Sequence, residues 1–403
     1  MNILSLLRPL LVVSFLSATT ANGQILVELG YFPFNGIFAI SGFDDFMLTG
    51  AGHVVDVTDP YAPQLVGSVS VGSGSSVVVD GQYGYFGTGM VATVKVVDLS
   101  IPSAPIITGT LTLPNSSGVF GLAVSGDVLY AANAQQGLAS IDISEPSMPT
   151  LIQQLPLSSA QQARGVVVHG SYAYVAEGSG LLIIDISDPA DMHVIGGLGE
   201  GFVSVAISED DTRLAAGRSG GGANVFDLAD PASPQVIYDV PGSQGTAHTV
   251  QILAGNLYMS AEQFGVRVYS MGDLGATELG AFDNSPNGQT FGAYASGELI
   301  FVAGLVNGAA VVGWGTVGVN VEPSGSVPLS CYPVPARNTL RWSGSHNVKY
   351  SGVKVIDTSG RCVLSARSVD GTIDISSLST GPYVLAMVYG EAVMATARFL
   401  KEE

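Results

Sequence analysis

Two kinds of segment have the residue types that a reactive or metal-binding site would need. Gly217 to Gly221 read Gly-Arg-Ser-Gly-Gly, which fits the Gly-x-Ser-x-Gly pattern of hydrolases. That pattern works as a strand–turn–helix elbow, and no helical periodicity follows it, so we expect a plain turn between two strands. The acidic segments Asp44-Asp45 and Glu209-Asp210-Asp211 could contact calcium, but their composition favours solvated hairpin turns.

The histidines offer no metal-binding pattern. None lies two to five residues from another, whereas zinc sites draw on closely spaced ligands. The five positions are His53, His169, His193, His248 and His346. The sequence therefore predicts no metal, no cofactor and no catalytic residue, because a nucleophile, a base and an orienting group do not occur together.

An aspartate recurs in a phrase made of apolar residues, the Asp itself and a short polar turn that usually contains proline. Successive copies lie 42, 44, 43 and 42 residues apart, and degraded copies at Ser270 and Gly313 continue the period. The full copies are centred on Asp56, Asp98, Asp142, Asp185 and Asp227. Because each Asp falls in a different repeat, we expect these carboxylates to accept hydrogen bonds from their own turns and not to form a cluster.

Each period contains four short β-rich runs, with a glycine-containing hairpin turn such as Gly126 or Gly170 before the Asp phrase. Four antiparallel strands in every forty-odd residues are typical of a propeller blade. A β-solenoid or a chain of separate modules would be the alternatives. We predict an all-β fold: a seven-bladed β-propeller over residues 24–318, closed by the N-terminal strand Ile25–Leu29.

Propellers usually bind ligands around their axis. Aligning the copies on the hairpin glycine predicts one ring at the start of the innermost strands and a second ring beside it. The first contains Gly36, Ser75, Phe120, Arg164, Val203, Thr249 and Phe291, and the second contains Asn35, Phe202 and His248. The candidate ligand-binding residues are Phe120, Arg164, Phe202, His248 and Phe291. The three phenylalanines would form an apolar site, and Arg164 and His248 would supply its polar groups. Packing between blades is the other interpretation of these side chains.

The repeats resemble a known family. Leu181-Leu182-Ile183-Ile184-Asp185-Ile186-Ser187-Asp188-Pro189 is similar to the signature of the LVIVD-repeat family. The resemblance extends over about residues 25–316. It implies an extracellular or surface β-propeller whose biochemical function is generally unassigned.

The C-terminal part opens with Tyr332-Pro333-Val334-Pro335, and the runs Val353–Arg361 and Ile373–Leu385 follow. In the order of these segments it resembles the sorting domain of the type IX secretion system of Bacteroidetes-type bacteria. The strand pattern predicts a small β-sandwich over residues 330–403, after a Pro/Gly/Ser linker at 319–329. The resemblance implies the type IX machinery as a partner, transfer across the outer membrane, and release or attachment at the surface.

The first 23 residues read as a secretory signal, with Arg8 before a short apolar run and small residues before Gln24. The alternative, a membrane anchor, would need about 20 apolar residues, so no membrane span is expected after cleavage. We expect a secreted or outer-membrane surface protein that passes through the periplasm. The formal net charge of −19 argues against nucleic acid as a partner.

The two cysteines, Cys331 and Cys362, both lie in the C-terminal part. An exported protein can keep a disulfide, so they form either one bridge or two free thiols.

These observations leave three hypotheses for function. The leading one is a non-enzymatic secreted or cell-surface propeller that binds a protein or glycan. A secreted hydrolase or lyase with its site in the central funnel is the first alternative, because such a site would draw single residues from several blades. A structural or adhesion component of the cell envelope is the second.

Overall fold

The structure is a computed structural model. It describes residues 24–402 except 33, 35–36, 90, 115–116, 158–161, 243–244, 273–274, 283–288, 305–307, 317–328, 333–335, 345–351, 358–361, 367–370 and 390–391. The predicted signal peptide and nearly all of the predicted linker lie outside the described residues. Every element in the described part is a strand, and it contains no helix long and apolar enough to cross a membrane.

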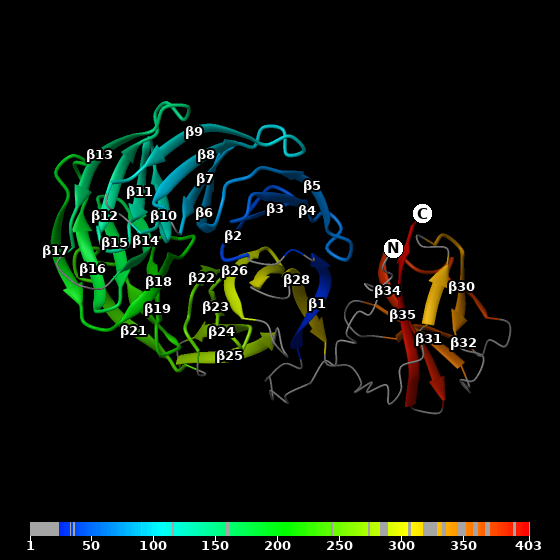
Figure 1. Ribbon diagram of the computed structural model, residues 1–403. Coiled ribbons are helices and arrows are strands. Elements are labelled where there is room, and N and C mark those ends of the chain that lie inside the picture. The colour runs from blue at the N-terminus through cyan, green and yellow to red at the C-terminus, as the bar shows by residue number, and fades with distance from the viewer. Residues whose placement is uncertain are drawn as a thin grey trace, which may run out of the picture.

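Residues 24–316 form seven four-stranded antiparallel sheets, the blades, arranged around a common centre (Figure 1). Blade one contains β2 (Ile40–Phe43), β3 (Phe46–Thr49), β4 (His53–Asp56) and β5 (Gln64–Ser68), and blade two contains β6 (Gly74–Asp80), β7 (Tyr83–Thr88), β8 (Thr93–Asp98) and β9 (Ile106–Thr112). Blade three contains β10 (Gly121–Ser125), β11 (Val128–Ala132), β12 (Leu138–Asp142) and β13 (Thr150–Leu155). Blade four contains β14 (Ala163–His169), β15 (Tyr172–Glu177), β16 (Gly180–Asp185) and β17 (His193–Leu198). Blade five contains β18 (Phe202–Ile207), β19 (Arg213–Arg218), β20 (Ala223–Asp227) and β21 (Gln235–Val240), and blade six contains β22 (Val250–Leu253), β23 (Asn256–Ser260), β24 (Val266–Gly272) and β25 (Gly275–Phe282). Blade seven contains β26 (Thr290–Ser296), β27 (Leu299–Gly304) and β28 (Gly308–Thr316) together with β1 (Gln24–Phe32).

The N-terminal strand completes the seventh blade. β1 runs antiparallel to β28 as its outer neighbour, with Leu26 opposite Trp314. The innermost strands β2, β6, β10, β14, β18, β22 and β26 face the centre in Figure 1, and β2 of the first blade contacts β26 of the last. The N-terminal strand therefore leaves the third strand of blade seven without an exposed edge.

The core lies between the blades. Each of the seven blade interfaces contains one cluster of buried apolar side chains, drawn from the two sheets on either side. At the interface between blades seven and one, Phe301 and Val311 pack with Met47 and Val55. The middle strands are rich in small and aromatic residues, so that neighbouring sheets approach closely and still fill the space between them.

The repeated Asp organises the turn after the third strand of its blade. The Oδ1 atom of each Asp accepts a hydrogen bond from the backbone N–H two residues later, at 2.8–2.9 Å. The five are Asp56, Asp98, Asp142, Asp185 and Asp227. These carboxylates lie in five different blades, and each one stabilises the turn that directly follows it.

The proline that follows each of these aspartates connects neighbouring blades. The carbonyl oxygens of Pro60, Pro102 and Pro146 lie against glycines in the outer strand of the preceding blade, where a Cβ would overlap them. Those glycines are Gly30, Gly67 and Gly109. The carbonyl of Pro189 accepts a hydrogen bond from Ser140, and that of Pro231 accepts one from Tyr174, both at 2.7 Å. In five of the seven repeats, this turn thus packs against the blade before it.

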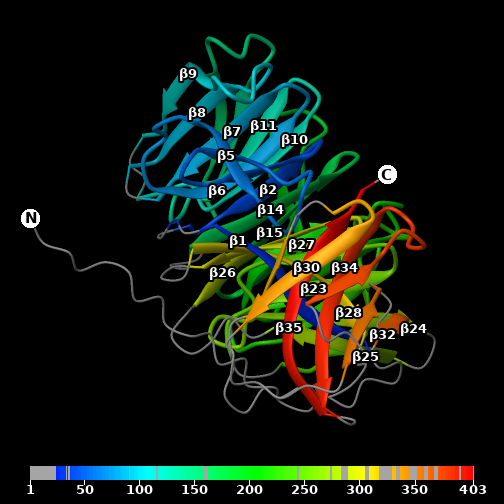
Figure 2. The same cartoon turned by 90° about the vertical axis from the view of Figure 1, so that its right-hand side faces the viewer.

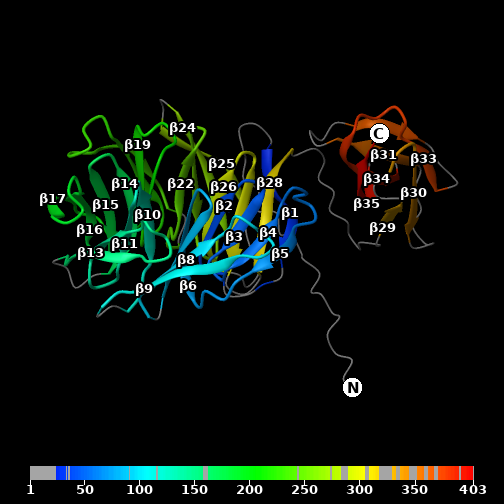
Figure 3. The same ribbon diagram turned by 90° about the horizontal axis from the view of Figure 1, so that it is seen from above.

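The C-terminal part forms two antiparallel sheets (Figures 2 and 3). One contains β29 (Leu329–Tyr332), β30 (Thr339–Gly344) and β33 (Thr372–Asp374). The other contains β32 (Cys362–Ala366), β31 (Gly352–Ile356), β34 (Gly381–Tyr389) and β35 (Ala392–Lys401). Both sheets contribute to one apolar cluster, with Leu340 and Ile373 from the first and Val355 and Leu385 from the second.

Candidate functional site

The innermost strand of several blades carries a bulge at its start. In blades two, four, five and seven, one extra residue interrupts the pairing of the first strand with the second. The extra residues are Ser75, Arg164, Val203 and Phe291. Bulges bend a strand and redirect a side chain, and they are common next to functional sites.

The same register position in the other three blades is occupied by Phe38, Phe120 and His248. We call the seven equivalent residues the axial ring: Phe38, Ser75, Phe120, Arg164, Val203, His248 and Phe291. Four of the five predicted binding residues belong to it. The structure thereby corrects the predicted alignment, since Phe38 takes the place given to Gly36, and His248 the place given to Thr249.

The cause of this error is the position of the hairpin glycine. In blade six, Ala254 and Gly255 both have positive φ, so the glycine occupies the second central position of the turn and the alignment slips by one residue. In blade one, Asp44 and Asp45 form the turn, and Gly42 lies within β2. Gly36 and Asn35, which were predicted for the two rings, lie outside the described residues.

Three members of the axial ring contact one another across two blade boundaries. The Phe291 ring lies 4.7 Å from the imidazole of His248 and 5.5 Å from the ring of Phe38, measured between centroids. Phe38 is 37% exposed, and Phe291 is half-buried. An aromatic surface of this kind can stack against a flat ligand group.

Glu262 is the polar partner of this aromatic group. Its Oε1 lies 3.0 Å from Nε2 of His248, and its backbone carbonyl accepts a hydrogen bond from Thr290, the residue before Phe291. Glu262 has a φ of +43° in the turn between β23 and β24, and Ala134 has the same φ in the equivalent turn of blade three. The backbone strain thus belongs to this turn type and not to Glu262 alone. Sequence analysis missed Glu262, because nothing in a lone acidic turn residue signals a histidine in another strand.

Arg164 supplies a positive charge at the ring. Its side chain is exposed, and its Nη2 donates to Oε1 of Gln162 at 3.4 Å. Burial lowers the pKa of His248, and the charge of Arg164 lowers it further, whereas the hydrogen bond and charge of Glu262 raise it. The net effect lowers the pKa of His248 below its usual value. Arg164, in contrast, carries a permanent positive charge at the ring.

Phe202 does not belong to the axial ring, which corrects its prediction as a binding residue. It is 1% exposed, it pairs with Arg218 at the start of β18, and its ring packs 6.2 Å from that of Phe226 in the core between blades four and five. For this residue, packing between blades is the correct interpretation. Phe120 is half-buried at its ring position.

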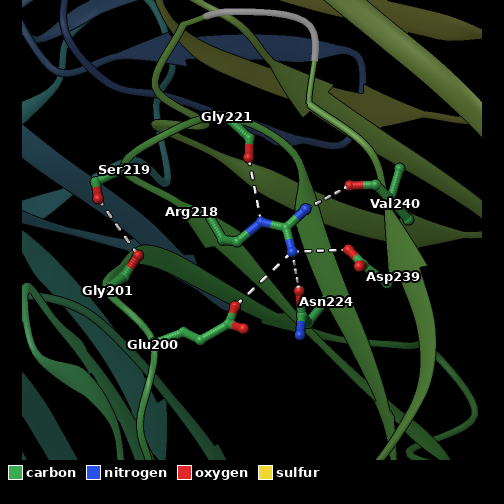
Figure 4. A network of polar contacts seen from close by, with 8 residues as sticks. All are labelled: Glu200, Gly201, Arg218, Ser219, Gly221, Asn224, Asp239 and Val240. Carbon is green, nitrogen blue, oxygen red and sulfur yellow. Dashed lines mark hydrogen bonds and ion pairs between the residues drawn. The ribbon is translucent and has the colours of Figure 1, made fainter.

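The Gly-Arg-Ser-Gly-Gly segment lies in the turn between β19 and β20, as predicted. Its arginine is the centre of a polar network (Figure 4). Arg218 donates to Asp239 at 2.7 Å, to Asn224 at 2.6 Å, and to the carbonyl oxygens of Gly221 and Val240, and Glu200 lies 3.8 Å away. Ser219 bonds to the carbonyl of Gly201. The segment is therefore a loop held in place by hydrogen bonds and ion pairs, and not the strand–turn–helix elbow of a hydrolase nucleophile.

The acidic hairpin turn at residues 209–211 also has internal partners. Asp210 accepts hydrogen bonds from Ser208 and Thr212, and these bonds lower its pKa to about 2. Within the described part of the chain, no three His, Cys, Asp or Glu side chains gather in a way that could hold a metal ion.

Cys362 is exposed at the start of β32 and has a free thiol in this structure. Cys331 lies in β29 of the other sheet, and its side chain is outside the described residues. The bridge that was one of two alternatives is therefore not formed here.

Comparison with known proteins agrees with this architecture. The LVIVD repeat matches residues 71–112, 119–155 and 160–197, and the secretion system C-terminal sorting domain matches residues 330–401. No curated protein matches the chain.

Among solved structures, the β-propeller domain of Cps50 (Swd1) from Myceliophteria thermophila is similar. It has a TM-score of 0.58 and 15% identity over 72% of this chain and 99% of that one, which supports the fold alone. The computationally designed Ika8 protein aligns over 94% of this chain and 100% of its own, with 13% identity. Its TM-score of 0.49 supports no further conclusion.

A sorting domain of this kind marks a protein for secretion or for the outer-membrane surface. Seven four-stranded blades precede it, and three of them coincide with LVIVD matches. The chain is therefore an exported β-propeller protein that contains LVIVD repeats and ends in a secretion system C-terminal sorting domain.

Proposed function

We propose that this protein is a non-enzymatic binding protein, exported through the type IX system, and that its propeller binds an extracellular protein or glycan at the axial ring. The observation that carries the proposal is the contact between Phe38, Phe291 and His248, three residues from three blades at one register position. An exposed aromatic group with a few fixed polar groups beside it is the usual composition of a binding site.

The neighbouring charges favour binding over catalysis. The carboxylate of Glu262 is bonded to His248, so that the pair orients the imidazole against Phe291. Hydroxyl groups at and next to the ring bond to the backbone: Thr249 accepts from Ala293 N–H, Ser260 accepts from Thr249 N–H, and Ser75 donates to the carbonyl of Val119. The described residues at the ring thus provide contacts and charge, without an activated nucleophile.

The test is a binding screen of the purified mature protein against envelope proteins and polysaccharides, repeated with Phe38→Ala and Phe291→Ala. We expect both substitutions to weaken binding of whichever partner is found, by about tenfold or more, since buried aromatic contacts dominate many interfaces. Tyr61→Ala is the matched control, because Tyr61 is 38% exposed in the same blade as Phe38 but lies in the proline turn.

Two results would contradict this proposal. One is turnover of a polymeric substrate by the wild-type protein. The other is a partner whose binding is unaffected by Phe38→Ala and Phe291→Ala and is lost with Tyr61→Ala.

A further inference from the structure

The propeller carries two arginines at the axial ends of its inner strands, and they differ in how their charges are used. Arg218 pairs with Phe202 at the start of β18, and Arg164 is the bulged residue at the start of β14. Both side chains therefore lie at the same end of the blades.

Arg218 is held mainly by its own blade. Its guanidinium meets the carboxylates of Asp239 and Glu200, at 2.7 and 3.8 Å, and three further oxygens of its own blade. Four of its five N–H groups donate hydrogen bonds in this network. Its function is to brace the loop.

Arg164 is engaged much less. Among the described residues its guanidinium has one hydrogen bond, the 3.4 Å contact to the neutral amide of Gln162, and no ion pair. Exposed arginines without an ion pair to another described residue also occur at Arg337 and Arg341, but Arg164 is the one at the axial ring.

The other groups of the axial ring indicate which ligand would suit Arg164. The guanidinium matches a carboxylate, which it can bind through two parallel hydrogen bonds. Elsewhere in the ring, Phe291 and Phe38 provide flat apolar rings, and Glu262 provides a carboxylate that can accept from hydroxyl groups. A glycan that contains a carboxylated sugar offers all three: apolar C–H faces, an anionic group and hydroxyl donors.

We infer that the ligand of the axial ring is a glycan that presents a uronic acid, with its carboxylate bound by Arg164 and a sugar ring of the same glycan stacked on Phe291 or Phe38. This inference rests on the proposed function and adds the chemical class of the ligand. The net charge of −19 favours a single acidic sugar in an otherwise neutral chain over a polyanion, because a polyanion would be repelled along its whole length.

The test uses oligosaccharide pairs that differ only in a terminal uronate against the matching neutral hexose. With the full mature chain, we expect the uronate member to bind roughly 10- to 100-fold more tightly, the range of a charged hydrogen-bonded pair. Arg164→Gln should reduce the affinity for the uronate to that for the neutral sugar. Arg218→Gln is the matched control and should leave this preference unchanged in protein that remains folded, as checked by circular dichroism.

The outcomes separate the two proposals. If Phe291→Ala weakens binding of both sugars but Arg164→Gln does not alter the preference, the uronate assignment is wrong and the binding site stands. If the protein binds neither sugar of any pair and instead binds a peptide through its C-terminal carboxylate in an Arg164-dependent way, the glycan class is wrong. If Phe38→Ala and Phe291→Ala leave all binding intact, the axial ring is not the site.

Discussion

The carbonyl oxygen of Pro146 in blade three lies directly against Gly109 in the outer strand of blade two. A Cβ at Gly109 would overlap that oxygen and would also lie 2.9 Å from Cδ of Pro149. The glycine is thus required by the neighbouring blade and not by its own backbone conformation.

We therefore predict that Gly109→Ala destabilises the propeller by about 1–3 kcal/mol, the usual cost of overpacking. Gly196→Ala is the control, because Gly196 has the equivalent register in blade four and the nearest atom to its Cβ would be Ile183 Cδ1 at 3.6 Å. Denaturant unfolding of both variants measures the difference. Equal stability of the two variants would show that the proline turn moves away without cost.

The blades could be predicted from the sequence because their signal is periodic. In five of the seven blades an Asp at the end of the third strand recurs with the blade, because it accepts a hydrogen bond from an N–H group of the turn that follows. The role of Gly109 could not be predicted, because it depends on a turn of another blade that begins 37 residues later at Pro146.

The axial ring was predicted in part, and its errors have a local cause. Arg164 and Phe291 lie where the hairpin glycine placed them, in blades whose turn has glycine at the first central position. His248 was shifted by one residue because its blade uses Ala254-Gly255 as the turn. Glu262 could not be found at all, since its link to His248 exists only after β22 and β23 have paired.

A second prediction concerns Tyr174, whose hydroxyl donates to the carbonyl of Pro231 at 2.7 Å. The ring is fully buried, and burial raises the pKa of the phenol. Tyr174→Phe should cost about 1 kcal/mol, because the carbonyl loses its donor in a dry interface.

Tyr85→Phe is the matched control for Tyr174. Tyr85 has the same position in blade two and is nearly as buried, but the described residues offer its hydroxyl no hydrogen bond. We expect Tyr85→Phe to be close to neutral in thermal unfolding. A loss as large as that of Tyr174→Phe would mean that burial of the ring, and not the bond to Pro231, sets the cost.

Arg218 gives a third prediction. Arg218→Gln removes donors from Asp239, Asn224 and two backbone carbonyls, and we expect it to destabilise the protein by about 1–3 kcal/mol. Arg218→Lys should recover only part of this, because an ammonium cannot reproduce the fork of the guanidinium. Thermal unfolding at low and high salt measures both. Full recovery by lysine would indicate that charge alone braces the loop.

A fourth prediction concerns the exposed thiol of Cys362. In the folded full-length protein, a maleimide reagent should label Cys362 without prior reduction, and Cys362→Ser should remove that labelling. Labelling that requires a reductant would instead indicate the bridge to Cys331, which sequence analysis left open.

A fifth prediction, on pH dependence, follows from the two histidines whose pKa values are lowered by burial, His53 and His248. A lowered pKa means that the unfolded chain binds protons more readily near pH 6 than the native protein does. Stability is therefore fully present above the unfolded histidine pKa of about 6.5 and falls as the pH decreases through the native values. Thermal unfolding between pH 8 and pH 5 should show this loss, and His248→Gln should make the slope shallower.

A second loss should begin below about pH 4, where the turn carboxylates become protonated. Hydrogen bonds from Thr58 lower the pKa of Asp56, and those from Ser144 lower the pKa of Asp142, so their contribution is present above the ordinary Asp pKa and disappears as the pH falls through the native one. Asp142→Asn keeps an acceptor for the turn without a titrating group. It should therefore unfold like the wild type at pH 7 and be less sensitive to acid than the wild type. An unchanged acid response in this variant would mean that the repeated aspartates do not control acid unfolding.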